Sequence, residues 1–221
     1  MASIEITSTY CAETDSKYRT QVTSNSFDVG AFSDRVNESY AYFPLSSLPA
    51  SAIVTCGVLK LRQFQGDYWN KEVTMRAAAC TSYIAPGSVT WDNKPAESGS
   101  AYADYAGFYG NVNADRTWTI NANLGNFRVN GYLIIKVWVP GAAAGDNSAK
   151  GFRPSTYSQA DLRPKITLNY YEMPIKCAAS PGAISKQVLS MMIAPAAGPV
   201  GKKVVGMKIA PAAGPINKTV F

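Results

Sequence analysis

Five aromatic side chains are the groups in this chain best suited to contact another molecule. They are Trp69, Tyr102, Tyr105, Tyr109 and Trp138. A flat aromatic ring covers the apolar face of a sugar while leaving the sugar's hydroxyl groups free to hydrogen-bond. These positions are therefore predicted to contact a glycan or a protein partner. The alternative interpretation is that they pack at sheet edges and between subunits.

Catalytic chemistry is difficult to build from this composition. The chain contains no histidine, which removes the usual general base and every arrangement in which a histidine activates a serine or a cysteine. The glycine-rich phosphate-binding motifs GxxxxGK[ST] and GxGxxG are missing as well. A pair of the fifteen acidic residues could serve a glycosidase, but these residues are scattered, and ordinary surface charge is the favoured interpretation. The sequence therefore predicts a protein that is not an enzyme.

Metal and cofactor sites are not indicated either. The four cysteines are Cys11, Cys56, Cys80 and Cys177. None of them forms a C-x-x-C pair, so neither a zinc site nor a redox pair is expected. Cys56 and Cys80 fall on predicted strands and could be neighbours, although free thiols are favoured over a disulfide. Loop oxygens that could bind calcium occur at Asp67, Asp115, Asp146 and Asn147. The spacing of an EF-hand is missing, which favours ordinary turn residues, and we expect no cofactor.

Short strands are the elements that must position these side chains. Apolar residues recur at every second position over residues 56–62, 73–80, 117–120, 132–139 and 165–170, and residues 40–45 are rich in aromatics, whereas helical periodicity is scarce. Within residues 56–62, the side chains of Gly57, Leu59 and Leu61 form one apolar row. Strands with such one-sided faces need a second sheet to cover them.

Other segments refine this prediction. Residues 97–113 are rich in Gly, Ser, Ala and Tyr without a firm period, which predicts a long surface loop that carries three of the tyrosines. The strand at 132–139 is apolar on both faces, so a loop or a partner is expected to cover the second face. Trp91 is assigned to the core. Together these patterns predict an all-β, antiparallel jelly-roll β-sandwich over residues 1–172.

A series of short motifs resembles the DNRLRE-domain family. The motifs are, in order, Tyr42-Phe43-Pro44-Leu45-Ser46-Ser47-Leu48-Pro49, Gly57-Val58-Leu59-Lys60-Leu61, Ser88-Val89-Thr90-Trp91-Asp92-Asn93-Lys94-Pro95, Gly151-Phe152, and Leu162-Arg163-Pro164-Lys165-Ile166-Thr167-Leu168-Asn169-Tyr170. The resemblance covers about residues 5–172. That family consists of β-sandwich modules of secreted and surface proteins that are related to carbohydrate-binding modules. The resemblance therefore implies a β-sandwich and, as an expectation, a contact with glycans.

The last part of the chain has a different composition. Residues 1–172 contain equal numbers of basic and acidic residues, fifteen of each, whereas residues 173–221 contain six lysines and no acid. A sequence of sixteen residues repeats there: Met191–Lys202 recurs as Met207–Lys218. This region is predicted to be a separate, basic, β-rich repeat tail. Six spaced lysines without interleaved aromatics are interpreted as a solvated face, and no nucleic-acid partner is expected.

The tail also carries bulky apolar residues that its own repeat cannot bury. They are Met191, Met192, Ile193, Val204, Val205, Met207, Ile209 and Phe221. A flexible linker would need few such residues. They are therefore predicted to make assembly contacts, by stacking of repeats, by docking on a neighbouring subunit, or by intertwining in an oligomer.

These features predict a non-enzymatic structural or interaction protein. The first hypothesis is a bacteriophage virion component, such as a capsid decoration or fibre protein, that forms a homo-oligomer or joins a capsid through its tail. The alternative is a carbohydrate-binding module of an extracellular or cell-surface protein. No apolar run approaches the ~18 residues of a membrane span, and the N-terminal residues lack the pattern of a signal peptide, so no membrane association is expected.

Overall fold

The computed structural model describes residues 1–20, 26–64, 71–108 and 113–172, and these residues form twelve strands and three short 3₁₀ helices. The strands are β1 (Ala2–Thr7), β2 (Tyr10–Asp15), β3 (Asp28–Ala31), β4 (Val36–Pro44), β5 (Ala52–Arg62), β6 (Val73–Cys80), β7 (Glu97–Phe108), β8 (Asp115–Ile120), β9 (Arg128–Val129), β10 (Tyr132–Trp138), β11 (Lys150–Gly151) and β12 (Lys165–Glu172). The 3₁₀ helices are η1 (Pro86–Ser88), η2 (Leu124–Phe127) and η3 (Ala160–Leu162).

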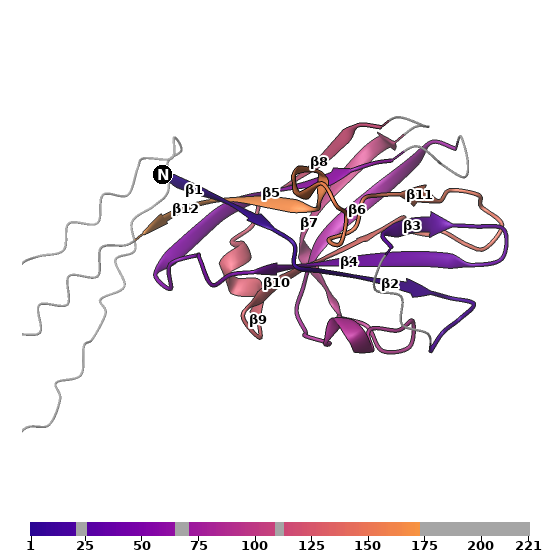
Figure 1. Cartoon of the computed structure of the whole chain (residues 1–221), viewed down its shortest axis with the longest axis horizontal. Coiled ribbons are helices and arrows are strands. Elements are labelled where there is room, and N and C mark those ends of the chain that lie inside the picture. The colour runs from indigo at the N-terminus through magenta and orange to yellow at the C-terminus, as the bar shows by residue number, and fades with distance from the viewer. Residues whose placement is uncertain (21–25, 65–70, 109–112, 173–221) are drawn as a thin grey trace, which may run out of the picture. The chain divides into compact units, whose positions relative to one another are not determined.

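The strands form two sheets (Figure 1). The smaller sheet has four strands in the order β1-β12-β5-β8. The larger sheet follows the order β11-β3-β4-β10-β6-β7, with β2 paired to β4 and β9 paired to β10. Every pairing is antiparallel. The prediction of an all-β protein with two antiparallel sheets is therefore confirmed.

The main core lies between the two sheets. Leu59 and Leu61 of β5 are fully buried and belong to it, as the alternation in this strand predicts. Gly57 stands in the same row, where a Cβ atom would lie 2.4 Å from Cδ1 of Leu124. A larger residue there would displace the Leu124 side chain, because η2 packs closely on β5. Trp118 is buried in the centre of the core, and its indole nitrogen donates to the carbonyl oxygen of Met75 at 3.2 Å.

A second, smaller apolar cluster covers the outer face of the larger sheet. Ile134 of β10 and Tyr42 of β4 are buried there against Val89, which belongs to the connection between β6 and β7. The Tyr42 hydroxyl donates to the carbonyl oxygen of Ile84 at 2.8 Å. A loop thus provides the cover that the two-sided apolar pattern of residues 132–139 requires.

The prediction that Trp91 belongs to the core is wrong. Trp91 lies in this same connection, is only half-buried, and is outside both apolar clusters. The ammonium group of Lys94 lies 3.7 Å from the centroid of its ring. The chain leaves the sheet at this point, so the ring of Trp91 packs on the Lys94 ammonium group near the surface and does not reach the core.

The predicted surface loop at residues 97–113 is also wrong, because most of it is strand β7. This strand pairs with β6 over its whole length, with shifts of register between Val73 and Met75 and between Ala78 and Cys80. Each shift places extra residues in β7 and interrupts its alternation. The buried residues of the strand, Ser98 and Ala101, are also small. Both features hide the strand from a search for period two.

Cys56 and Cys80 are not neighbours. Cys56 lies on β5 of the smaller sheet and Cys80 on β6 of the larger one. The cysteines at positions 11, 56 and 80 are all free. Burial raises the pKa of Cys80 to about 12, so this thiol stays protonated. Both side chains act as small packing groups, which was the favoured interpretation.

The described body ends on β12, where Glu172 pairs with Ala52 at the start of β5. Residues 173–221, with the whole repeat and all eight predicted assembly residues, lie outside the described residues. Within the described part of the chain, no helix is long and apolar enough to cross a bilayer.

Candidate binding surface

A row of aromatic and charged side chains, half-buried on β6 and β10 and exposed on β7, crosses the outer face of the larger sheet. Trp138 on β10 lies opposite Arg76 on β6, and Arg76 in turn lies opposite Asp104 on β7. Tyr102 occupies the same face of β7, two residues from Asp104. Adjacent strands thus bring together Arg76 and Trp138, which lie 62 positions apart in the sequence. We call Arg76, Tyr102, Asp104 and Trp138 the outer-face row.

Arg76 is the centre of this row. Its Nε and Nη2 atoms donate to the two carboxylate oxygens of Asp104, each at 2.7 Å. Its guanidinium carbon lies 4.0 Å from the ring centroid of Tyr102 and 6.0 Å from that of Trp138. The hydrogen bonds from Arg76 lower the pKa of the Asp104 carboxyl. A planar cation is therefore held against aromatic rings by a fixed carboxylate.

The outer-face row presents aromatic and polar groups side by side at the surface. Tyr102 is 41% exposed, so the ring is accessible to an apolar surface, and Asp104 adds hydrogen-bond acceptors beside it. A pocket of about 390 Å³ begins at Arg76 and Asp104 and extends to the turn at Pro140 and Gly141. The surface thus combines aromatic contact area with polar groups, which suits either a glycan or a protein.

The structure separates the predicted contact residues. Tyr102 and Trp138 share the outer face. Tyr105 lies on the other side of β7, where its ring packs 5.6 Å from that of Trp118 and its hydroxyl accepts from Nη1 of Arg116 at 3.4 Å. It therefore packs against the core and does not belong to the row. Trp69 and Tyr109 lie outside the described residues.

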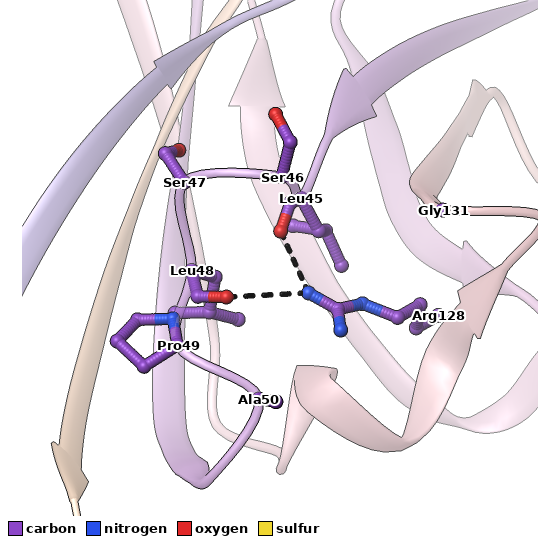
Figure 2. Close-up of a pocket in the computed structure, with 8 residues that line it drawn as sticks. All are labelled: Leu45, Ser46, Ser47, Leu48, Pro49, Ala50, Arg128 and Gly131. Carbon is purple, nitrogen blue, oxygen red and sulfur yellow. Dashed lines mark hydrogen bonds between the residues drawn. The ribbon is translucent and has the colours of Figure 1, made fainter.

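A second pocket, of about 480 Å³, lies beside the connection between β4 and β5 (Figure 2). Figure 2 shows Arg128 directed at the backbone of this connection. Its Nη2 atom donates to the carbonyl oxygen of Leu45 at 2.6 Å and to that of Leu48 at 3.5 Å. Arg128 therefore fastens the chain where it passes from one sheet to the other, and the pocket has a structural explanation.

A buried acidic cluster is present that the sequence did not reveal. One carboxylate oxygen of Glu13 accepts from the Ser26 hydroxyl at 2.6 Å and from the backbone nitrogen of Asp28 at 2.9 Å, and the other accepts from Nδ2 of Asn37 at 2.6 Å. Burial, with the nearby Asp28 charge, raises the pKa of Glu13 to about 7. The only signal in the sequence was the spacing of Glu13 and Asp15 along one strand.

This cluster does not form a catalytic cleft. Neither Glu13 nor Asp28 lines any of the three pockets found among the described residues. Glu13 is also buried. Two neighbouring carboxyl groups with raised pKa values resemble an acid–base pair, but the carboxylate of Glu13 is enclosed by its own hydrogen-bond partners.

Two of the groups considered for calcium, Asp115 and Asp146, make other contacts, whereas the buried side-chain oxygen of Asn147 has no hydrogen-bond partner in the described part of the chain. Asp115 pairs with Lys60 and Arg62 on β5. Asp146 accepts from the backbone nitrogen of Ala143 at 2.9 Å, as in a turn. Over the described ranges, no group of three or more acidic or cysteine side chains is arranged to hold a metal ion. Asp67 lies outside those ranges.

Comparison with known proteins gives no family assignment. No protein-family model matches the chain, and no curated protein matches it. The resemblance to the DNRLRE-domain family therefore stays a prediction that depends on the quoted motifs alone.

Proposed function

We propose that this chain is a non-enzymatic interaction protein in which residues 1–172 form a displayed β-sandwich of jelly-roll type and residues 173–221 anchor it in a larger assembly. The assembly we favour is a bacteriophage virion, with the protein as a capsid decoration or a fibre and with other structural subunits, including copies of itself, as partners.

The main support is the contrast between the two parts. The body buries its own apolar side chains: the core between the sheets is closed, and the outer cluster is covered by the connection between β6 and β7. The tail carries bulky apolar residues in a repeat too short to bury them. Cover for the tail must come from contact with something else, which is what an anchor requires.

Removal of residues 173–221 tests this proposal. We expect the truncated protein to keep a cooperative thermal unfolding transition within a few degrees of that of the full chain, because each described strand pairs with another described strand. We expect its oligomeric state, measured by light scattering, to fall to a monomer. A truncated body that is molten, or an unchanged oligomer, would contradict the proposal.

Two tail variants of the full chain separate apolar contact from charge. Met207→Ser with Ile209→Ser should abolish assembly, because both remove apolar surface. Lys202→Gln with Lys203→Gln should leave assembly unchanged. The reverse outcome would show that the lysines, and not the apolar residues, hold the subunits together.

Glycan binding is the second candidate function, and the outer-face row is the observation that favours it. On a glycan array, we expect Tyr102→Ala and Trp138→Ala each to weaken any saturable signal by about fivefold, since stacking on one ring contributes on the order of 1 kcal/mol. Tyr18→Ala is the matched control, because Tyr18 is also an exposed tyrosine but lies outside the row. Equal binding by all variants would remove the row from this role.

A further inference from the structure

Two arginines on the connection between β11 and β12 have no acidic partner among the described residues. Arg153 lies two positions after β11, and Arg163 lies two positions before β12. The arginines that do pair with a carboxylate are Arg19, Arg35, Arg62 and Arg76. A proline follows each of the two, and proline restricts the residue before it to an extended backbone. This connection thus presents two guanidinium groups whose charge no described carboxylate neutralises.

The guanidinium group of Arg153 lies against two aromatic rings. Its central carbon is 4.2 Å from the ring centroid of Tyr157 and 5.0 Å from that of Phe64. Phe64 is close to this arginine because its backbone nitrogen donates to the carbonyl oxygen of Gly151 at 3.2 Å, which joins the end of β5 to the end of β11. Stacking on aromatic rings favours one orientation of the planar guanidinium group.

The outer part of this guanidinium group is accessible to another molecule. Arg153 is half-buried, and of its side-chain nitrogens only Nε is buried. Within the described chain the side chain donates no hydrogen bond, so its two Nη groups are available to a ligand. The aromatic rings remove part of the hydration of the cation, which is unfavourable unless an anion replaces the lost water. A carboxylate can do so by accepting two parallel hydrogen bonds from a guanidinium group.

Arg163 contacts the backbone of the same tyrosine. Its Nε atom donates to the carbonyl oxygen of Tyr157 at 2.7 Å, which orients the guanidinium group and leaves its Nη groups without a partner among the described residues. Asp161, the acidic residue of η3, is exposed and pairs with neither arginine in the described chain. We call Arg153, Tyr157 and Arg163 the arginine site.

The neighbouring part of the smaller sheet adds further positive charge. Lys165 of β12 lies directly opposite Lys60 of β5. Arg62 of β5 joins these lysines to the arginine site, because its carbonyl oxygen accepts from a backbone nitrogen of that site at 2.9 Å. The three cations share two carboxylates, those of Asp115 and Glu5. A surface with an excess of cations attracts an acidic partner and orients it.

We propose that the arginine site docks an acidic segment of a protein partner, whose carboxylates bind the Nη groups of Arg153 and Arg163. Charge complementarity favours this occupant, and arginine and tyrosine are residue types enriched at protein interfaces. A nucleic-acid strand is disfavoured, because it binds through a series of phosphate contacts, and the exposed carboxylates of Asp115 and Asp161 lie among these cations. The site belongs to the body and does not depend on anchoring by the tail.

Modification of arginine by phenylglyoxal, followed by peptide mass spectrometry, measures the occupancy of this site in the full chain. Residues 173–221 contain no arginine, so binding of an acidic probe to the basic tail does not enter the signal. A saturating hexaglutamate peptide should slow the modification of Arg153 and Arg163 by about threefold or more and leave that of the exposed Arg19 unchanged. Hexaglutamine, the uncharged control peptide, should slow none of them.

Arg163→Gln tests whether the two arginines bind one partner. In this variant, the hexaglutamate concentration that half-protects Arg153 should rise by about fivefold, which corresponds to about 1 kcal/mol. Arg19→Gln is the matched control and should leave that concentration unchanged. Thermal melts confirm that each variant is folded, and the protection of the wild type tests the proposal without any substitution.

Three results would overturn the proposal. The first is that hexaglutamate protects neither arginine of the wild type, or protects no better than hexaglutamine. The second is that a folded Arg163→Gln variant shows unchanged protection of Arg153. The third is that a single-stranded DNA oligonucleotide protects both arginines at lower concentration than hexaglutamate, which would assign the site to nucleic acid. None of these results bears on anchoring by the tail or on the outer-face row, which truncation and Tyr102→Ala test separately.

Discussion

Lys136→Met is expected to destabilise the body by about 3 kcal/mol, because it leaves the buried carboxylate of Glu38 without one of its cationic partners. Lys136 is 4% exposed and lies 3.0 Å from Oε1 of Glu38 and 3.1 Å from Oε2 of Glu97. Lys94 approaches the second oxygen of Glu38 at 2.5 Å, and the Tyr40 hydroxyl donates to that oxygen at 3.1 Å. Without the ammonium group of Lys136, the carboxylate of Glu38 stays buried and keeps Lys94 as its one cationic partner among these groups.

The pKa of Glu38 reflects the same balance. Burial alone would raise this pKa, but the charges of Lys136 and Lys94 outweigh burial and lower it. Equilibrium unfolding in urea at pH 7 measures the loss. The double variant Lys136→Met with Glu38→Gln should recover part of the lost stability, because a glutamine at position 38 carries no charge.

Lys165→Met is the matched control for this measurement. Its ammonium group pairs at 2.8 Å with Glu5, whose side chain is 49% exposed. Exposed pairs of this kind contribute about 1 kcal/mol or less. An equal loss in the free energy of unfolding for Lys136→Met and Lys165→Met would contradict this prediction. It would show that the ion pairs around Glu38 contribute no more than an exposed pair.

Glu13 is expected to make the body less stable at pH 8 than at pH 4.5, by about 3 kcal/mol. Burial raises the pKa of this carboxyl from 4.5 to about 7, so the folded protein holds the proton more tightly than the unfolded chain does. The stabilisation is therefore fully present below pH 4.5 and is lost as the pH rises to about 7. Asp28 acts in the same direction, because burial raises its pKa from 3.8 to about 6.

Glu13→Gln should flatten this pH dependence. The side-chain oxygen of Asn37 is buried without a hydrogen-bond partner, so rotation of the Asn37 amide would let it accept from the new Gln side chain. Urea unfolding of both proteins between pH 4.5 and 8 measures the difference, with the exposed Glu5→Gln as the control. Parallel profiles for the wild type and Glu13→Gln would show that Glu13 is ionised throughout the range. Glu38 works in the opposite direction, since its lowered pKa removes stability as the medium becomes more acidic.

Alternation predicted most of the strands because one face of each is apolar and fully buried. Leu59 and Leu61 of β5 and Leu133, Ile135 and Val137 of β10 are all in the core, as their period of two requires. Strand β7 escaped prediction because its buried residues, Ser98 and Ala101, are small and its register shifts twice. Alternation is recognisable only when bulky apolar residues differ clearly from the polar residues between them and when the pairing is regular. Strand β7 meets neither condition.

The residues of the outer-face row were only partly predictable. The sequence predicts a contact role for Tyr102 and Trp138 because flat aromatic rings can cover the apolar face of a sugar. It predicts none for Arg76 and Asp104, since nothing in the sequence shows that β6 will lie between β7 and β10. Their pairing through two hydrogen bonds of 2.7 Å depends on strand order alone.

The sequence by itself determined the all-β class, the inward faces of the strong strands, the lack of histidine chemistry and the contrast in composition between body and tail. These are local properties, which side-chain type and period express directly. Only the tertiary structure decided that β4 and β5, which are neighbours in the chain, belong to opposite sheets. It also buried Glu13, Glu38 and Lys136 in polar networks and placed Arg153 against Phe64. Such features depend on which strands become neighbours, and strand order is set by the packing of the whole chain.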